Sequence, residues 1–259
     1  MGDAKEVATP LATGHSLSVH DKQSPTNATE FRSLIGALQY LNITRPDLGF
    51  AVNKLSQFMH KPTTTHWTAA KRLLRYLKGT LFHGLHLRCD TRPMLHAYTD
   101  ADWAGNIDDR TSTSGFVIYI GANPISWSSR KQQSVAWSST EAEYRAIAMA
   151  SAELIWVKSL LQELGIHMDT APSLYCDNIG ATYVCANPIF HSRMKHIEID
   201  YHFVRELVKA SKMRVSHIST HDQLADILTK PLSRLRTIQL RDKMDVSDGT
   251  SILRGRVKI

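Results

Sequence analysis

The sequence has few cysteines, no long hydrophobic run and no signal-peptide core. Its 259 residues include only three cysteines, Cys89, Cys176 and Cys185, and no Cys-x-x-Cys pair. A sparse and odd set of this kind argues against a disulfide framework and indicates buried thiols in a reducing compartment. No apolar run approaches the roughly 18–20 residues that a membrane helix needs, and the first thirty residues lack an apolar signal core. We therefore expect an intracellular protein without a membrane partner.

The overall composition is that of an ordinary globular protein. Hydrophobic residues make up 42% of the chain and charged residues 21%, which is enough for a core of normal size. The formal net charge of +7 favours an anionic partner, with nucleic acid as the first candidate. Many unrelated proteins are equally basic, so charge alone does not identify the partner. The length suits one large domain, or one domain with a helical extension.

The N-terminal part is predicted to be a tail followed by three helices. Residues 1–27 are rich in Thr, Ser, Ala and Pro, which is typical of a disordered tail. Apolar residues then recur at helical spacing in residues 30–41, 48–59 and 65–80. Pro46 separates the first two helices, because the residue before a proline avoids the helical conformation. A helical segment is therefore expected over residues 28–90.

After residue 90 the hydrophobic period changes from that of helices to that of strands. The pattern predicts strands at residues 94–100, 114–121, 125–137, 172–178 and 214–220. It predicts helices at residues 139–164, 179–187, 195–213 and 222–230. The order βββαβααβα indicates an α/β domain over residues 91–235. Residues 236–259 are basic and are expected to form a weakly structured C-terminal tail.

Four acidic residues lie at strand ends or in helices of this predicted domain. Asp100 ends the first strand and Asp177 the fourth, whereas Glu143 lies in the first turn of the long helix and Asp226 in the last helix. Because open sheets bind ligands at the carboxyl ends of their strands, these acids could converge at one edge. Clustered carboxylates need cations between them. All-oxygen ligation suits Mg²⁺ or Mn²⁺ rather than zinc, and two such ions could support phosphodiester cleavage.

Each of these acids also has a purely structural interpretation. Asp100 could cap a turn, Asp177 could cap the helix that follows it, and Asp226 could face solvent. The capping box Ser/Thr-x-x-Glu fits both residues 138–141 and residues 140–143. Glu143 could therefore simply cap the start of the long helix. Any one acid alone favours the structural interpretation, whereas all four in this order of elements favour a site.

Several long runs resemble the polyproteins of copia-type retrotransposons. Residues 98–146, from YTDADWAG to STEAEYRA, resemble the ribonuclease H domain of these polyproteins, as do residues 174–206 and 223–232. Residues 31–80 resemble the segment that joins reverse transcriptase to that domain. The resemblance covers roughly residues 28–256. It implies a ribonuclease H-like fold, which is a mixed five-stranded sheet with helices on both faces.

The resemblance also implies a two-metal site with four carboxylates. The family's glutamate is followed by a bulky residue and then x-Ala, which Glu143 matches better than Glu141. Asp102 and Glu141 remain open as alternatives to Asp100 and Glu143. The expected cofactor is a pair of Mg²⁺ ions, with Mn²⁺ as a substitute and no small-molecule cofactor. The implied catalytic residues, which are also the metal ligands, are Asp100, Glu143, Asp177 and Asp226.

The implied activity is endonucleolytic hydrolysis of the RNA strand of RNA–DNA hybrids. The 2′-hydroxyl would distinguish RNA from DNA in the strand that is cut. Cellular ribonucleases H carry a histidine that helps the product to leave, and the candidate for it is His221, with His217 as the other histidine in that segment. The side chains that could bind the nucleic acid are Arg130, Lys131, Asn178, Arg193 and Lys195.

The chain lacks the family's Tyr-x-Asp-Asp polymerase motif. We therefore expect a C-terminal piece of a polyprotein, with the reverse transcriptase core of the parent polyprotein as its partner. The family implies a virus-like particle in the cytoplasm, and the expected intracellular locations are the cytoplasm, such a particle or the nucleus. The alternative function is a catalytically inert retroelement remnant that keeps the fold and at most binds nucleic acid.

Overall fold

The chain divides into two structural units, and one boundary between them lies near residue 90, where the hydrophobic period changes. A computed structural model describes residues 4–14, 16–89, 94–168, 170–186 and 197–250. The helical unit comprises Met1–Leu87, Ile107–Asp109 and Lys230–Ile259, and the sheet unit comprises Arg88–Asn106 and Arg110–Thr229. Each unit has its own cluster of buried hydrophobic side chains.

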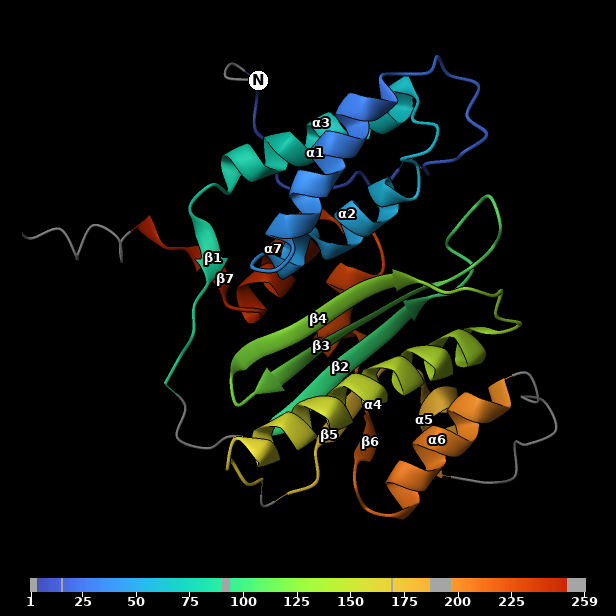
Figure 1. Cartoon of the computed structure of the whole chain (residues 1–259), viewed down its shortest axis with the longest axis vertical. Helices are drawn as coiled ribbons and strands as arrows, with labels where there is room; N and C mark the ends of the chain where they lie inside the picture. The colour runs from blue at the N-terminus through green and yellow to red at the C-terminus, as the bar shows by residue number, and fades with distance from the viewer. Residues whose placement is uncertain (1–3, 15, 90–93, 169, 187–196, 251–259) are drawn as a thin grey trace, which may run out of the picture. The chain divides into compact units, whose positions relative to one another are not determined.

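The helical unit contains the three helices that the N-terminal sequence predicts. The first helix, α1, buries Phe31, Ile35 and Leu38 and begins after Asn27, whose side chain accepts hydrogen bonds from two backbone N–H groups. The unit also contains a short antiparallel pair, β1 with β7, and a C-terminal helix, α7. The elements, shown in Figure 1, are α1 (Ala28–Leu41), η1 (Pro46–Leu48), α2 (Gly49–Ser56), α3 (Thr64–Gly79), β1 (His83–Leu85), α7 (Arg234–Lys243) and β7 (Val246–Asp248).

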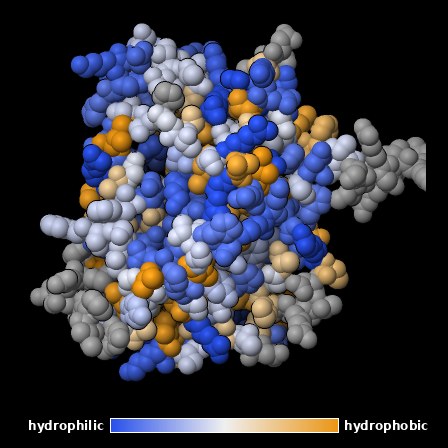
Figure 2. All heavy atoms as spheres, turned by 180° about the vertical axis from the view of Figure 1, so that it is seen from behind, coloured by the Kyte–Doolittle hydropathy of each residue, from blue (hydrophilic) through white to orange (hydrophobic). Residues whose placement is uncertain are grey.

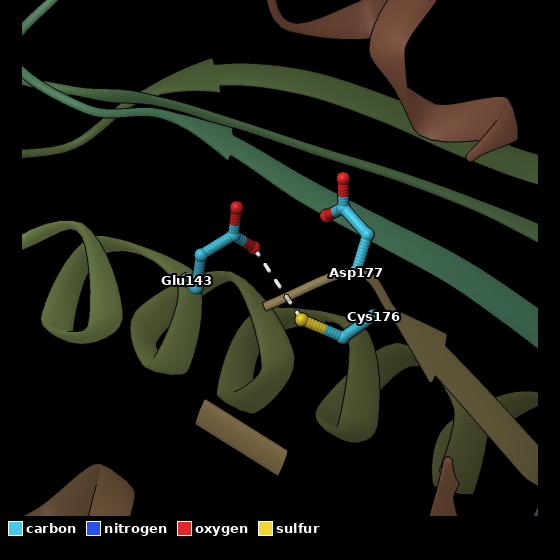
Figure 3. Close-up of side chains that lie close together, drawn as sticks. All are labelled: Glu143, Cys176 and Asp177. Atoms are coloured by element: carbon cyan, nitrogen blue, oxygen red, sulfur yellow. Dashed lines mark hydrogen bonds between the residues drawn. The ribbon is translucent and has the colours of Figure 1, made fainter. Parts of the chain in front are cut away.

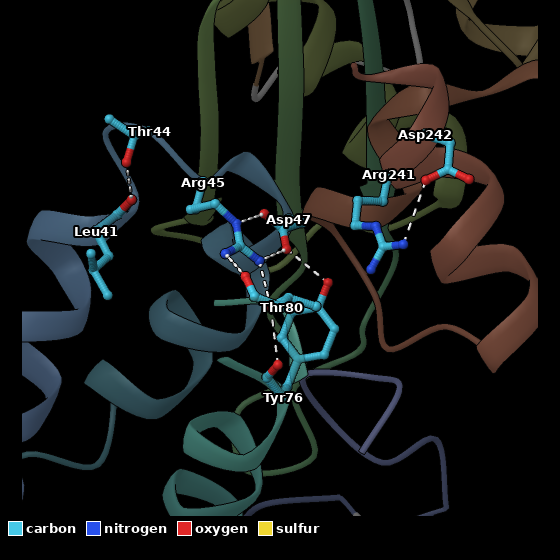
Figure 4. A network of polar contacts seen from close by, with 8 residues as sticks. All are labelled: Leu41, Thr44, Arg45, Asp47, Tyr76, Thr80, Arg241 and Asp242. Atoms are coloured by element: carbon cyan, nitrogen blue, oxygen red, sulfur yellow. Dashed lines mark hydrogen bonds and ion pairs between the residues drawn. The ribbon is translucent and has the colours of Figure 1, made fainter. Parts of the chain in front are cut away.

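A buried ion pair fixes the turn between α1 and α2. Arg45 is 6% exposed and Asp47 is 1% exposed, and the guanidinium donates to both carboxylate oxygens at 2.9 and 2.7 Å. The same guanidinium donates to Thr80, and the hydroxyl of Tyr76 donates to Asp47 at 2.7 Å (Figure 4). Burial and the charge of Asp47 raise the pKa of Tyr76, so this hydroxyl stays protonated and keeps its bond. The buried charges of Arg45 and Asp47 are therefore compensated by each other and by hydrogen bonds with Thr80 and Tyr76.

Both segments that the sequence predicts to be tails carry buried contacts in the helical unit. In the N-terminal segment Leu11 and Leu17 join the hydrophobic core, and Arg72 of α3 donates to Thr9 at 2.7 Å. In the C-terminal segment α7 buries Leu240 completely, and β7 pairs with β1. The structure differs here from the prediction because the partners of these segments lie far away in the sequence, where no local pattern reveals them.

The sheet unit contains a mixed sheet of five strands, as the resemblance implies. The strand order is β4-β3-β2-β5-β6. The strands β2, β3 and β4 are antiparallel to their neighbours, whereas β5 lies parallel to β2 and β6 lies parallel to β5. All five predicted strands are present, and the α/β class is confirmed. Their bounds are β2 (Leu95–Asp102), β3 (Thr113–Ile120), β4 (Asn123–Lys131), β5 (Ser173–Cys176) and β6 (Arg214–His217).

Three α-helices cover one face of this sheet. The long helix α4 (Ser139–Glu163) packs directly on β2 and β3, and α5 (Ile179–Ala186) and α6 (Glu198–Lys209) lie beside it (Figure 1). Successive side chains of a strand point to opposite faces. Leu95 and Ala97 of β2 accordingly join the core under α4. The even-numbered residues of β2, which include Asp100, face the other side of the sheet.

The helix that carries residues 224–228 packs on the opposite face of the sheet, near Gly115 of β3. The sequence predicts a helix over residues 222–230, and the structure has two 3-10 helices, η4 (Thr220–Asp222) and η5 (Leu224–Leu228). Gly115 pairs with Asp100 across the sheet, so both residues share a face. A Cβ atom added to Gly115 would lie 2.8 Å from Leu228 Cβ and from Thr229 Cγ2. The end of η5 thus lies close above the strand because residue 115 has no side chain.

None of the described helices is long and apolar enough to cross a membrane. Figure 2 shows hydrophilic side chains over most of the face that it draws, with hydrophobic side chains in small separate groups. Single exposed hydrophobic residues of this kind are normal on a protein surface.

Replacing Gly115 with alanine should destabilise the sheet unit and displace η5. The new methyl group would meet Leu228 and Thr229 below the normal contact distance, and overpacking of this kind costs about 1–3 kcal/mol. Urea unfolding followed by circular dichroism measures the change. The control is Gly36→Ala in α1, where nothing lies within 4 Å, and there we expect stabilisation by about 0.5–1 kcal/mol. Equal stability of Gly115→Ala and wild type would contradict the close approach of η5.

Candidate active site

The four acids that the sequence singles out lie on four elements of the sheet unit. Asp100 lies in β2, Glu143 is the fifth residue of α4, Asp177 directly follows β5, and Asp226 lies in η5. Three of them are buried, with exposed fractions of 2% for Asp100, 5% for Glu143 and 4% for Asp226, and Asp177 is half-buried. Because β2 and β5 are parallel neighbours, their carboxyl ends lie at the same edge of the sheet.

Glu143 is the central acid of this cluster. Its carboxylate accepts a hydrogen bond from the backbone N–H of Ala101 and shares a hydrogen bond with Asp100. One ligand atom each of Glu143, Cys176 and Asp177 lies within 4.8 Å of the other two. Figure 3 shows these three side chains together, with Glu143 reaching from α4 toward the end of β5. Three acids from β2, α4 and the end of β5 therefore meet at one place.

Asp226 is connected to this cluster through Thr229. The hydroxyl of Thr229 donates to Asp100 Oδ2, and the backbone N–H of Thr229 donates to the carbonyl oxygen of Asp226 at 3.2 Å. η5 packs on β2 and β3, which brings the segment that carries Asp226 next to Asp100. The structure thus groups the elements of all four predicted acids at one end of β2.

The cluster of acids keeps a proton on Glu143 in the metal-free protein. Burial, followed by the charges of Asp100 and Asp177, raises the pKa of Glu143 from its ordinary value of 4.5 to about 9. A divalent cation would remove this cost, since it would replace repulsion among the carboxylates by attraction. The carboxylate oxygens of the acids are the donors that Mg²⁺ and Mn²⁺ prefer. The donor set therefore fits the expected cofactor.

Cys176 lies inside the cluster as a neutral hydrogen-bond donor. Burial and the charge of Glu143 raise the pKa of the Cys176 thiol far above its usual range, so the sulfur stays protonated. Its Sγ lies 3.6 Å from Glu143 Oε2, a distance at which an S–H group can donate to a carboxylate. Metal ligation by cysteine requires the thiolate, so oxygen ligands are favoured here. From the sequence alone Cys176 is expected only to be a buried thiol, and its position directly before Asp177 is the signal that places it beside the site.

The two alternative acids have other partners or surroundings. Glu141 closes the start of α4, where its carboxylate accepts from the N–H of Trp137 at 2.8 Å and pairs with Arg145 at 2.6 Å. Its own N–H donates to Ser138, the N-cap of α4, so the capping interaction belongs to Glu141 and not to Glu143. The carboxylate of Asp102 lies against Gly105, since a Cβ atom added to Gly105 would be 1.7 Å from Asp102 Oδ2.

The candidate contacts for nucleic acid are spread over several elements. Arg130 is exposed and Lys131 half-buried at the end of β4. Asn178 accepts a hydrogen bond from the N–H of Ala181 at 2.9 Å and so stabilises the start of α5. Two further candidates, Arg193 and Lys195, lie outside the described residues.

Of the two histidines in the segment before Asp226, His217 lies beside a site residue. His221 is exposed and lies 3.5 Å from Asp222. One ring nitrogen of His217 lies 3.2 Å from the carbonyl oxygen of Asp177. The product-release role of His221 stays a prediction.

The sheet and its acids define a ribonuclease H-like domain. The antiparallel strands β4, β3 and β2 continue into the parallel strands β5 and β6, and acids lie at the end of β2, in α4, after β5 and in η5. The chain belongs to the family of retrovirus-related Pol polyproteins of copia-type retrotransposons.

The relatives of known sequence support this family assignment. The chain is 60% identical over 232 residues to the retrovirus-related Pol polyprotein from transposon RE2 of Arabidopsis thaliana. The matched region covers 90% of this chain and 16% of that relative. It is 42% identical over 243 residues to the retrovirus-related Pol polyprotein from transposon TNT 1-94 of Nicotiana tabacum. The matched region covers 90% of this chain and 18% of that relative. The chain therefore spans only about a sixth of the length of these relatives. No family model matches the sequence.

Solved structures show weaker likenesses. A crystal structure of LC11-RNase H1 in complex with RNA/DNA hybrid is 15% identical, covers 52% of this chain and 93% of its own, and has a TM-score of 0.40. The strand order and the strand directions of the sheet are the features that define the fold.

The raised pKa of Glu143 should make the stability of the metal-free protein depend on pH. The pKa of Glu143 is higher in the folded state than in the unfolded state. Its contribution to the free energy of unfolding is therefore fully present below about pH 4.5 and is lost as the pH rises through about 9. We expect the Tm in the presence of a chelator to fall over this window, and Mg²⁺ to restore it most at the alkaline end.

The variant Glu143→Gln removes the ionisable group and should flatten this dependence on pH. The matched control is Glu163→Gln, because Glu163 lies at the exposed end of the same helix, and it should keep the slope of the wild type. Equal slopes for wild type and Glu143→Gln in chelator would show that Glu143 does not carry the buried proton.

Proposed function

We propose that this chain is a Mg²⁺-dependent ribonuclease H that hydrolyses the RNA strand of RNA–DNA hybrids. The observation that carries the proposal is the meeting of Asp100, Glu143 and Asp177 at one end of β2, with the segment of Asp226 beside them. Membership in the Pol polyprotein family supports it, since these are proteins of elements related to retroviruses.

The residues that would hold the ions are Asp100, Glu143, Asp177 and Asp226. When bound, two divalent ions neutralise charge on the phosphate and lower the pKa of a water molecule. Asp177 is the most exposed of the four acids, so the scissile phosphate would approach from its side. Glu143 would have to release its proton, because only the carboxylate is a good ligand.

The reaction is the addition of water across one P–O bond. The water oxygen attacks the phosphorus, the bond from phosphorus to the leaving sugar oxygen breaks, and that oxygen takes up a proton. The protein's part is to place the phosphate among the carboxylates. Arg130 and Lys131 would contribute by binding backbone phosphates beside the site.

Amide variants of the four acids should abolish cleavage of an RNA–DNA hybrid. We expect Asp100→Asn and Glu143→Gln to lower kcat on the order of 100-fold or more, because each removes a charged ligand. The matched controls are the neighbouring acids, and Asp102→Asn and Glu141→Gln should keep most of the activity. The measurement is gel analysis of an end-labelled RNA strand in a hybrid, with Mg²⁺ and with a chelator.

The same assay separates the enzyme from the inert remnant. A remnant would bind the hybrid in a gel-shift measurement and leave the labelled strand uncut at every Mg²⁺ concentration. That result for the wild type would refute the nuclease proposal. Loss of cleavage in Asp102→Asn with full activity of Asp100→Asn would move the metal ligand to the alternative residue.

Removal of a phosphate-binding side chain should weaken binding and its dependence on salt. For Arg130→Ala we expect the slope of log K against log salt to become shallower by about 1, since one counterion fewer is released. The control is Lys209→Ala, an exposed cation at the end of α6. Fluorescence anisotropy of a labelled hybrid at several salt concentrations measures both slopes. Equal slopes for Arg130→Ala and wild type would exclude Arg130 as a phosphate contact.

We also propose that the chain works with the reverse transcriptase core of its parent polyprotein. The similarity to retrovirus-related Pol polyproteins supports this partner. A sedimentation experiment with a purified reverse transcriptase core of the same family would test it. Co-sedimentation supports the pairing, and independent sedimentation at micromolar concentrations argues against it.

A further inference from the structure

The two residues that cap η5 each donate a hydrogen bond to an acid on another element. Gln223, the residue before η5, donates through Nε2 to Asp177 Oδ1 at 3.4 Å. Thr229, the residue after η5, donates through its hydroxyl to Asp100 Oδ2. Between them, η5 has only five residues and carries Asp226. Three of the four acids are thus connected through the two ends of one short helix.

The side chain of Gln223 is held in one orientation by three bonds. It is completely buried, and its Oε1 accepts from the N–H of Ala225 in η5 at 3.2 Å. Its Nε2 donates to the carbonyl oxygen of Thr99 in β2 at 2.8 Å as well as to Asp177. A flipped amide would turn its oxygen toward a carbonyl and a carboxylate, which are acceptors too. Gln223 therefore joins η5, β2 and the residue after β5 in a fixed geometry.

The hydroxyl of Thr229 is similarly committed to the site. Thr229 is completely buried, and its Oγ1 lies near two acceptors, Asp100 Oδ2 and the carbonyl oxygen of Asp226 at 3.3 Å. The hydroxyl therefore fixes the carboxylate of Asp100 relative to the backbone that carries Asp226.

We propose that Gln223 and Thr229 are positioning residues that hold Asp177 and Asp100 in place relative to Asp226 before any ion binds. The proposal rests on the proposed two-ion site and names the side chains that preassemble it. Carboxylates of like charge repel each other and would rotate apart without donors. Ions would then have to bind and reorder the site in one step, which lowers their affinity.

Binding of Mn²⁺ to the full chain without substrate tests this proposal directly. Thr229→Val keeps the shape of the side chain and removes the hydroxyl, whereas Thr229→Ser keeps the hydroxyl. We expect Thr229→Val and Gln223→Met to weaken Mn²⁺ binding roughly 10–100-fold in isothermal titration calorimetry. Thr229→Ser should bind close to the wild-type affinity, because the conservative change restores the donor.

A matched control separates positioning from stability. Thr237 of α7 is also a buried threonine, and its hydroxyl donates to the carbonyl oxygen of Ser233 at 2.9 Å. Thr237→Val should lower the Tm and leave Mn²⁺ affinity unchanged. If Thr229→Val and Gln223→Met likewise lower only the Tm, their role is structural and the proposal is overturned. Should Thr229→Val fail to fold, Gln223→Met decides the question at the other end of η5.

Failure of this proposal can be told apart from failure of the nuclease proposal. If the wild type binds Mn²⁺ with the expected dependence on Thr229 but leaves the hybrid uncut, positioning stands and the nuclease proposal fails. If the wild type cuts the hybrid and the variants bind Mn²⁺ normally, the nuclease stands and positioning fails. If the wild type binds no Mn²⁺ at all, the two-ion site fails and the positioning proposal falls with it.

Discussion

Repulsion among buried carboxylates at one end of β2 is the physical constraint that shapes the site of the sheet unit. Burying several negative charges together is costly unless protons, donors or cations compensate them. The structure supplies the first two, through the proton that Glu143 retains and through donors from Cys176, Gln223 and Thr229. No structural requirement of the sheet calls for such a cluster, since apolar residues would fill the same space at lower cost. The proposed binding of divalent cations would supply the third compensation, and it would give the cluster of acids a role.

The fold explains how acids so distant in sequence reach this place. A parallel pair of strands brings Asp177 to the edge where Asp100 lies, and the start of α4 presents Glu143 from one face of the sheet. η5 approaches from the opposite face, which is possible because Gly115 leaves room for it. The helical unit is organised around a different principle, a hydrophobic core with one buried and fully paired arginine, Arg45. Arg45 and Asp47 neutralise each other within this unit.

Periodicity and local motifs predict the strands, the long helices and the four acids, because these depend on residues close together in the chain. They also leave Glu141 and Glu143 both open, and only the contacts of Glu141 with Trp137 and Arg145 show which one caps α4. The features that the sequence does not reveal depend on distant residues. Thr229 and Asp100 are 129 positions apart, and their hydrogen bond has no local signature. The same holds for Leu11 and Leu17, which join a core built from residues far along the chain.

The location of bound ions in a crystal would show whether the four acids form a metal site. Crystals of the full chain grown with Mn²⁺ would show the ions by their anomalous scattering. We expect two ions about 3.5–4 Å apart, bound by the carboxylates of Asp100, Glu143, Asp177 and Asp226. An empty cluster at saturating Mn²⁺, or ions bound only elsewhere with Asp226 turned away, would contradict this expectation.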